Sequence, residues 1–202
     1  MTGFAALQQL ARRPAAKERC DLCGSAIAEQ HDHLLETEKR RLVCACRPCT
    51  ILFGDSGQRY RRVPTRILAL GNFHLSGSQW ESLMVPINMA FFYRGGAEGK
   101  VTAVYPSPAG ATESHLELET WQRIEKENPV LLSMEPDVEA LVVNRLGEQH
   151  GFGENQYFLA PIDQCFRLVG LVRKHWRGLS GGSDLWEHLR EYFAELEGAQ
   201  HA

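Results

Sequence analysis

The sequence predicts an α+β protein in two parts. The first is a small cysteine-rich module at residues 1–57, and the second is a larger mixed α/β domain at residues 58–202. Five of the six cysteines fall within thirty residues, which defines the module. Short runs of β-branched and aromatic residues, separated by turn signals, predict a mainly antiparallel sheet in the larger part. Two amphipathic segments at the end of the chain predict two C-terminal helices.

The cysteines of the module form two Cys-x-x-Cys pairs, Cys20 with Cys23 and Cys46 with Cys49. Each pair lies on a tight turn that directs two thiolates toward one point, and two such turns complete a tetrahedral site of four sulfurs. We therefore expect these four cysteines to bind one zinc ion, with a single rubredoxin-type iron as the alternative. Charged residues flank the cysteines, whereas a redox iron favours apolar cover, so zinc is preferred.

The order of elements between the cysteines indicates the kind of module. Residues 31–36 and 40–44 are expected to form two short strands with a turn at 37–39. A helix should follow, with Pro48 in its first turn and Gly54 at its end. This order is typical of a treble-clef zinc module. A Cys-x-x-Cys turn, or knuckle, comes first, then a hairpin, and then a helix that carries the second cysteine pair.

Three further residues of the module are possible ligands. Cys44 lies two residues before Cys46 on an extended segment, so both should share a strand face. It could replace Cys46, support the site as a nearby thiol, or simply be buried. His31 and His33 share one face of the first strand, and together with Cys44 they could form a second site. Partly exposed strand residues without a ligand are the alternative for both histidines.

The charge of the chain is distributed unevenly. Residues 1–66 carry 12 basic and 7 acidic residues, a net of +5, whereas residues 67–202 carry 10 basic and 18 acidic residues, a net of −8. A basic module could bind nucleic acid through Arg40, Arg41, Arg47 and the basic segment 59–66. It could equally attract the acidic part of its own chain or an acidic protein partner.

The composition excludes a membrane span, because no apolar run approaches the roughly 20 residues that one needs. The N-terminus lacks the apolar stretch of a secretory signal, and Phe4, Leu7 and Leu10 instead suggest a short helix. Motif-spaced cysteines without such a signal favour reduced thiolates on a metal, so we expect a cytoplasmic protein.

The larger part should alternate strands and helices. A capping box at Ser78–Glu81 predicts the start of a helix that ends before Pro86. The small-residue segment 106–114 is expected to be a hairpin or a domain-contact loop, followed by an extended segment at 115–119. Strands are expected at 66–70, 88–93, 100–105, 137–144 and 157–160, and further helices at 121–128, 161–176 and 184–196. Ser183 or Asp184 should cap the last helix, with Glu187 reaching back.

The two C-terminal helices raise two questions of chemistry. Arg177, Gly181, Gly182 and Ser183 surround the start of the last helix and are a candidate anion site, although a glycine-rich turn between helices is the commoner explanation. Cys165 lies among apolar residues and is expected to be a buried, inert thiol. The sequence contains no catalytic triad spacing, dinucleotide fingerprint or metalloprotease motif, so no catalytic residues are predicted and a binding role is favoured over an enzyme.

Seven segments spread over nearly the whole chain form a recognisable set of motifs: Cys20–Gly24, His31–Leu34, Cys44–Cys49, Tyr60–Pro64, Pro108–Ser114, Pro136–Leu141 and Trp176–Gly182. Together they resemble a family of uncharacterised bacterial proteins encoded beside high-affinity nickel–iron uptake hydrogenases. The resemblance implies an accessory or maturation role around that enzyme.

The leading hypothesis is therefore a zinc-binding accessory or maturation protein that acts by protein–protein interaction, with a hydrogenase subunit or maturation factor as its partner. The first alternative is electron transfer by a rubredoxin-like iron. The second is a zinc protein that binds nucleic acid.

Overall fold

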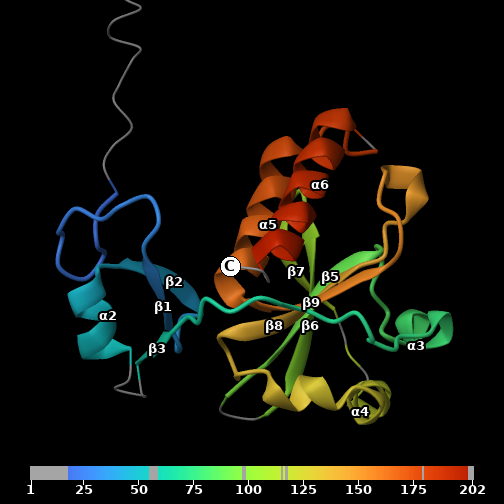
Figure 1. The fold of residues 1–202 in the computed structure, drawn as a ribbon, viewed down its shortest axis with the longest axis horizontal. Coiled ribbons are helices and arrows are strands. Elements are labelled where there is room, and N and C mark those ends of the chain that lie inside the picture. The colour runs from blue at the N-terminus through green and yellow to red at the C-terminus, as the bar shows by residue number, and fades with distance from the viewer. Residues whose placement is uncertain are drawn as a thin grey trace, which may run out of the picture. The chain divides into compact units, whose positions relative to one another are not determined.

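The computed structural model describes residues 18–54, 59–96, 99–114, 116, 118–178 and 180–199. The chain divides into two compact units, Met1–Arg62 and Val63–Ala202, which Figure 1 shows in blue to cyan and in green to red. The short helix expected around Phe4 lies outside the described residues.

The first unit contains a three-stranded antiparallel sheet in the order β2-β1-β3. The predicted hairpin is confirmed: β1 (Asp32–Glu36) pairs with β2 (Arg41–Ala45), so that Leu34 lies opposite Val43. The third strand, β3 (Tyr60–Arg62), pairs with the other edge of β1. Residues 60–62 therefore belong to the sheet of the first unit.

The predicted helix after the hairpin is α2 (Arg47–Phe53), with Pro48 in its first turn and Gly54 at its end. Gly54 has an ordinary right-handed φ of −67°, so its role is close packing rather than a left-handed turn. A Cβ at this position would lie 2.5 Å from the Thr50 carbonyl oxygen and 3.1 Å from Cβ of Arg62. The helix can end against the sheet only because residue 54 has no side chain.

The second unit is built on a six-stranded sheet in which all pairs are antiparallel, as predicted. The segment 106–114 forms a tight hairpin within this sheet, since Ser107 pairs with Gly110. In sheet order the strands are β4 (Leu68–Ala69), β9 (Gln156–Pro161), β8 (Glu139–Asn144), β5 (Met89–Arg94), β6 (Val101–Ser107) and β7 (Gly110–Ser114).

Helices cover both faces of the six-stranded sheet (Figure 1). The two predicted C-terminal helices, α5 (Ile162–His175) and α6 (Ser183–Gly198), pack on one face, where Phe158 of the sheet stacks on Phe193. The other face is covered by α3 (Gly77–Ser82), α4 (Leu118–Glu127) and the 3-10 helix η1 (Pro129–Ser133). A short 3-10 helix, η2 (Glu148–His150), lies between β8 and β9.

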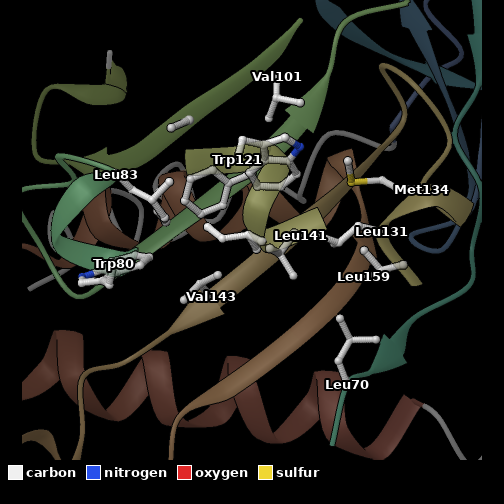
Figure 2. Close-up of a cluster of buried hydrophobic side chains, with 14 residues drawn as sticks. Leu70, Trp80, Leu83, Val101, Trp121, Leu131, Met134, Leu141, Val143 and Leu159 are labelled. Atoms are coloured by element: carbon white, nitrogen blue, oxygen red, sulfur yellow. The ribbon is translucent and has the colours of Figure 1, made fainter. Parts of the chain in front are cut away.

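The core under α3 and α4 is centred on aromatic side chains. Trp121 of α4 stacks on Phe92 of β5 with ring centroids 5.5 Å apart, and Figure 2 shows the indole among Val101, Leu131 and Leu141. Each of these side chains is nearly fully buried. The second unit thus has a large apolar core.

Three local predictions in the second unit were wrong. The capping box of α3 is formed by Ser76 and Gln79 instead of Ser78 and Glu81, because the chain turns into the helix two residues earlier. The last helix has no side-chain cap: its N-cap is Gly182, whose φ of 82° suits a glycine-rich turn. The segment expected to be extended at 115–119 already enters α4 at Leu118, while residues 115 and 117 lie outside the described residues.

Among the described residues, no helix combines the length and the apolar character that crossing a membrane demands.

Candidate metal centre

The four predicted cysteines come together in the first unit. One sulfur from each of Cys20, Cys23, Cys46 and Cys49 lies within 4.8 Å of the other three, and Cys23 Sγ is 3.6 Å from Cys46 Sγ. None of the four forms a disulfide. A tetrahedral zinc ion with Zn–S bonds of ~2.3 Å separates its sulfurs by roughly 3.8 Å, so this donor set fits a metal ion of that size.

Backbone hydrogen bonds shape the first knuckle. The N–H of Gly24 donates to the Cys20 carbonyl (2.8 Å), and the N–H of Cys20 donates to the Ser25 carbonyl (2.8 Å). Gly24 has φ of +75°, a conformation that closes the turn and that a side chain would strain. The knuckle is joined to β2 because the N–H of Asp21 donates to the Cys44 carbonyl (2.9 Å) and the N–H of Cys44 donates to the Asp21 carboxylate (2.8 Å).

The second pair is positioned by the start of α2. Cys46 is the N-cap residue with extended backbone angles, and Cys49 lies in the first turn. Cys49 and Cys20 are buried with Leu34, Val43, Ala45 and Tyr60, whereas Cys23 is exposed. The site therefore has a buried side toward the module core and an open side toward solvent.

The four thiols differ in acidity. Hydrogen bonds from the Ser25 side chain and backbone lower the pKa of Cys23 to about 6. Burial raises the pKa of Cys49 to about 12, and the neighbouring sulfurs add to this shift. Four thiolates this close repel one another unless a cation lies between them, so a divalent metal would favour deprotonation of all four.

The structure separates Cys44 from this centre and places it with the two histidines. His33 and Cys44 are directly opposite each other in the β1–β2 pairing, and one ligand atom of each lies within 4.8 Å of one of His31. Cys44 and Cys46 were expected to share a strand face, but β2 ends at Ala45 and Cys46 has already left the strand to begin α2. Burial raises the pKa of the Cys44 thiol, and the Asp21 and Glu18 carboxylates raise it further.

The basic side chains of the module are partly neutralised within it. Glu36, which is buried, accepts hydrogen bonds from Lys39 (3.3 Å), Arg41 (3.4 Å) and Arg59 (3.2 Å). Burial by itself would raise the pKa of the Glu36 carboxyl, but the bonds from Arg59 and Lys39 outweigh it and lower that pKa. Arg47 pairs with Asp32 at 3.3 Å. Several arginines considered for nucleic-acid binding therefore have a carboxylate partner in the module.

A third cluster of potential ligands lies in the second unit and was missed by the sequence reasoning. Asp184 accepts a hydrogen bond from His175 (2.6 Å), and the rings of His175 and His188 stack with centroids 3.8 Å apart. The bond from His175 lowers the pKa of the Asp184 carboxyl. The available signal was a histidine in the last turn of one helix, and an aspartate and a histidine four residues apart in the first turns of the next.

The four residues of the predicted anion site lie beside this cluster. The N–H of Arg177 donates to the Gly181 carbonyl (2.9 Å), and the guanidinium donates to the carbonyls of Lys174 (3.0 Å) and Trp176 (2.8 Å). Gly181 and Gly182 both have positive φ, and Ser183 begins α6. The carboxylate of Asp184 lies in the first turn of the same helix, so it is this negative charge that the helix N-terminus faces. Anion binding here stays a prediction.

The second unit also has a surface hollow of about 600 Å³ beside β4 and β9. Its polar lining includes Gln156, whose amide donates to Glu197 (2.6 Å), and its apolar lining includes Phe73 and Tyr157. Cys165, by contrast, is fully buried as expected, and burial raises its pKa well above the usual value. Among the described residues, neither Cys165 nor the lining of this hollow belongs to a group of converging metal ligands, whereas the four cysteines of the first unit do.

Comparison with known proteins identifies a family. Residues 19–200 match the family described as "Family of unknown function (DUF5947)". The chain belongs to this family. The match extends over both units, so the four-cysteine cluster and the six-stranded sheet lie within a single DUF5947 region. No curated protein and no solved structure matches the chain.

Proposed function

We propose that this DUF5947 protein is a zinc-binding accessory or maturation protein that acts in the cytoplasm through protein–protein contacts, with a nickel–iron hydrogenase subunit or maturation factor as its partner. The observation that carries the proposal is on α2. The helix that supplies Cys49 also exposes three consecutive apolar side chains, Ile51 (61%), Leu52 (68%) and Phe53 (39%). One ion would thus hold in place a helix whose outer face suits contact with another protein.

Zinc would act here as a structural cross-link. The core of the first unit consists of a few buried side chains, two of which are the ligands Cys20 and Cys49. A core of this size does not stabilise so short a segment alone, and small modules of this kind rely on the free energy of metal binding. The sulfurs are the only ligand type in the cluster, which suits a closed structural site rather than one with an open position for substrate.

A family resemblance and the distribution of charge support the proposed partner. The resemblance is to proteins encoded beside nickel–iron uptake hydrogenases, and it implies an accessory role around that enzyme. The second unit carries most of the negative charge of the chain, while arginines of the module are already paired with Glu36 and Asp32. This pairing reduces the basic surface available to nucleic acid and favours a protein partner.

Elemental analysis and an absorption spectrum of the purified protein test the metal. One equivalent of zinc in a colourless protein supports a structural site. Stoichiometric iron with the red colour of a ferric four-thiolate centre overturns it in favour of electron transfer. The variant Cys49→Ser should lose the metal in either case, whereas Cys165→Ser, which changes a thiol outside the cluster, should retain it.

The partner is tested by co-purification from cells that express the hydrogenase. The double substitution Ile51→Asp with Leu52→Asp should abolish recovery of the hydrogenase component while the zinc content stays at one equivalent. Leu132→Asp is the matched control, because Leu132 is equally exposed (63%) but lies in the second unit. Unchanged hydrogenase activity after deletion of the gene would refute the proposed role.

A further inference from the structure

We propose that His31, His33 and Cys44 form a second metal site, separate from the four-cysteine centre, that binds a divalent transition ion through two imidazoles and one thiolate and leaves a fourth position open. One ligand atom from each side chain lies within 4.8 Å of one from each of the other two. This inference is independent of the identity of any protein partner.

The β1–β2 hairpin brings the three residues together. His33 and Cys44 are direct cross-strand partners, so their side chains project from the same face of the sheet as neighbours. His31 precedes His33 by two residues, which places it on the same side, and the two rings meet edge to face with centroids 4.7 Å apart. The next pair along the hairpin, Leu34 with Val43, projects from the opposite face into the module core.

The hydrogen bonds of His31 prepare one ring nitrogen for a cation. Its Nδ1 lies 2.9 Å from the Ala28 carbonyl oxygen and 3.1 Å from that of Glu29, and carbonyl oxygens can only accept. Nδ1 must therefore carry the proton, which leaves the lone pair of the neutral ring on Nε2. A histidine that donates one ring N–H to a backbone carbonyl and presents the other nitrogen is the usual state of a metal ligand.

The Nε2 atom of His31 gives a second, independent reason to expect a ligand. The side chain of His31 is only 8% exposed, and among the residues that the structure describes Nε2 has no hydrogen-bond partner. Buried polar atoms are rarely left unpaired, because the loss of water is then uncompensated. A cation held jointly with His33 and Cys44 would satisfy this lone pair.

Negative charge around the three ligands favours a cation over any other occupant. The carboxylate of Glu18 lies 3.3 Å from Nδ1 of His31, and the carboxylate of Asp21 accepts the backbone N–H of Cys44 at 2.8 Å. Two imidazoles with one thiolate suit zinc, cobalt, nickel and copper, whereas magnesium and calcium prefer oxygen ligands. Three protein ligands leave room for a water molecule or an exogenous donor, so this ion should exchange more readily than one held by four thiolates.

The test is a cobalt titration of the full, untagged chain that already holds one zinc ion. Co²⁺ is the probe because a thiolate ligand gives it a charge-transfer absorption and a distorted tetrahedral site gives it strong visible bands. We expect one equivalent of Co²⁺ to bind with both features while zinc, measured by elemental analysis, is not released. His31→Gln and Cys44→Ser should each weaken this binding by about 100-fold or more and leave the zinc in place.

Two further variants make the test decisive. His74→Gln changes a histidine outside all three clusters and should leave cobalt binding unaltered, while His188→Gln removes a ligand of the cluster formed by His175, Asp184 and His188. If His188→Gln abolishes the cobalt spectrum and His31→Gln does not, the ion binds in the second unit and the inference fails. It also fails if the zinc-loaded chain binds no cobalt. Circular dichroism and the retained zinc show that each variant is folded, and His33→Gln replaces Cys44→Ser if the latter is not.

Discussion

The two units of this protein are both α+β, but they are held together by different interactions. The core of the second unit includes Trp121, Phe92 and many aliphatic side chains on both faces of a six-stranded sheet. The core of the first unit includes Cys20 and Cys49 of the candidate metal site, and the buried carboxylate of Glu36 lies on its strand β1. The comparison teaches that in the small unit the core and the candidate metal site share residues, whereas in the large unit the apolar core cluster contains none of the described candidate metal ligands.

The largest effect should come from removal of the metal. A strong chelator at neutral pH should unfold the first unit and leave the second intact, because structural zinc in small modules contributes on the order of 10 kcal/mol to folding. Hydrogen exchange measured by mass spectrometry should show loss of protection in β1, β2 and α2 and unchanged protection in β5, β8 and β9. Cys49→Ser should reproduce this pattern without chelator. Retained protection in β1 and β2 after complete metal loss would mean that the small core folds alone.

A substitution in the apolar core tests the second unit. Trp121→Ala should destabilise it by about 3–5 kcal/mol, because the indole is nearly fully buried and its removal leaves a large cavity. The zinc content of the chain should not change. Leu132→Ala, at an exposed position of the same region, is the control and should alter stability by less than about 0.5 kcal/mol. Thermal unfolding, monitored by the circular dichroism of the backbone so that the signal does not depend on tryptophan, measures the stability of both variants.

The second unit contains an ion pair between a buried carboxylate and a half-exposed arginine. The carboxylate of Glu139 is fully buried and accepts two hydrogen bonds from Arg66, at 2.6 and 2.7 Å. Arg66→Ala should cost about 3 kcal/mol, at the low end for an unpaired buried charge because Arg66 is itself half-exposed. Adding Glu139→Gln should restore part of the loss, which a chemical unfolding curve of the double variant measures. A double variant less stable than Arg66→Ala would show that the charge is not the source of the cost.

The sequence predicted the parts of both units that depend on local chemistry. The cysteine spacing located the four converging sulfurs, and runs of strand-forming residues between turn signals located the β1–β2 hairpin and the antiparallel strands β5, β6, β8 and β9. Pro48 and Gly54 marked the two ends of α2, although Gly54 acts by close packing rather than by a left-handed turn. These features follow from neighbours in the chain.

What the sequence did not reveal depends on residues that are distant or on small shifts of register. The membership of β3 in the first sheet requires its pairing with β1, more than twenty residues away. For Cys44 the sequence offered two places, beside Cys46 or with His31 and His33, and the choice between them depends on β2 ending at Ala45. The cluster of His175, Asp184 and His188 forms only because a tight turn folds α6 back on α5.

The smallest expected effect concerns Glu36 and its dependence on pH. Glu36→Gln should destabilise the first unit only modestly, because its partners Lys39, Arg41 and Arg59 are all more than half exposed and water can replace the carboxylate around them. The pKa of Glu36 is lower in the folded chain than its ordinary value of 4.5. Its contribution to stability is therefore complete above about pH 4.5 and is lost as the pH falls through the lowered folded pKa.

The measurement is the difference in unfolding free energy between the wild-type chain and Glu36→Gln across the acid range. Protons also compete with zinc for the thiolates, but this affects both chains alike, so their difference isolates the carboxyl group. We expect a constant difference at neutral pH that declines toward zero below pH 4.5. A difference that grew as the pH fell would mean that Glu36 is protonated in the folded unit and that burial outweighs its three cations. Metal binding would then have to supply an even larger share of the stability of the first unit.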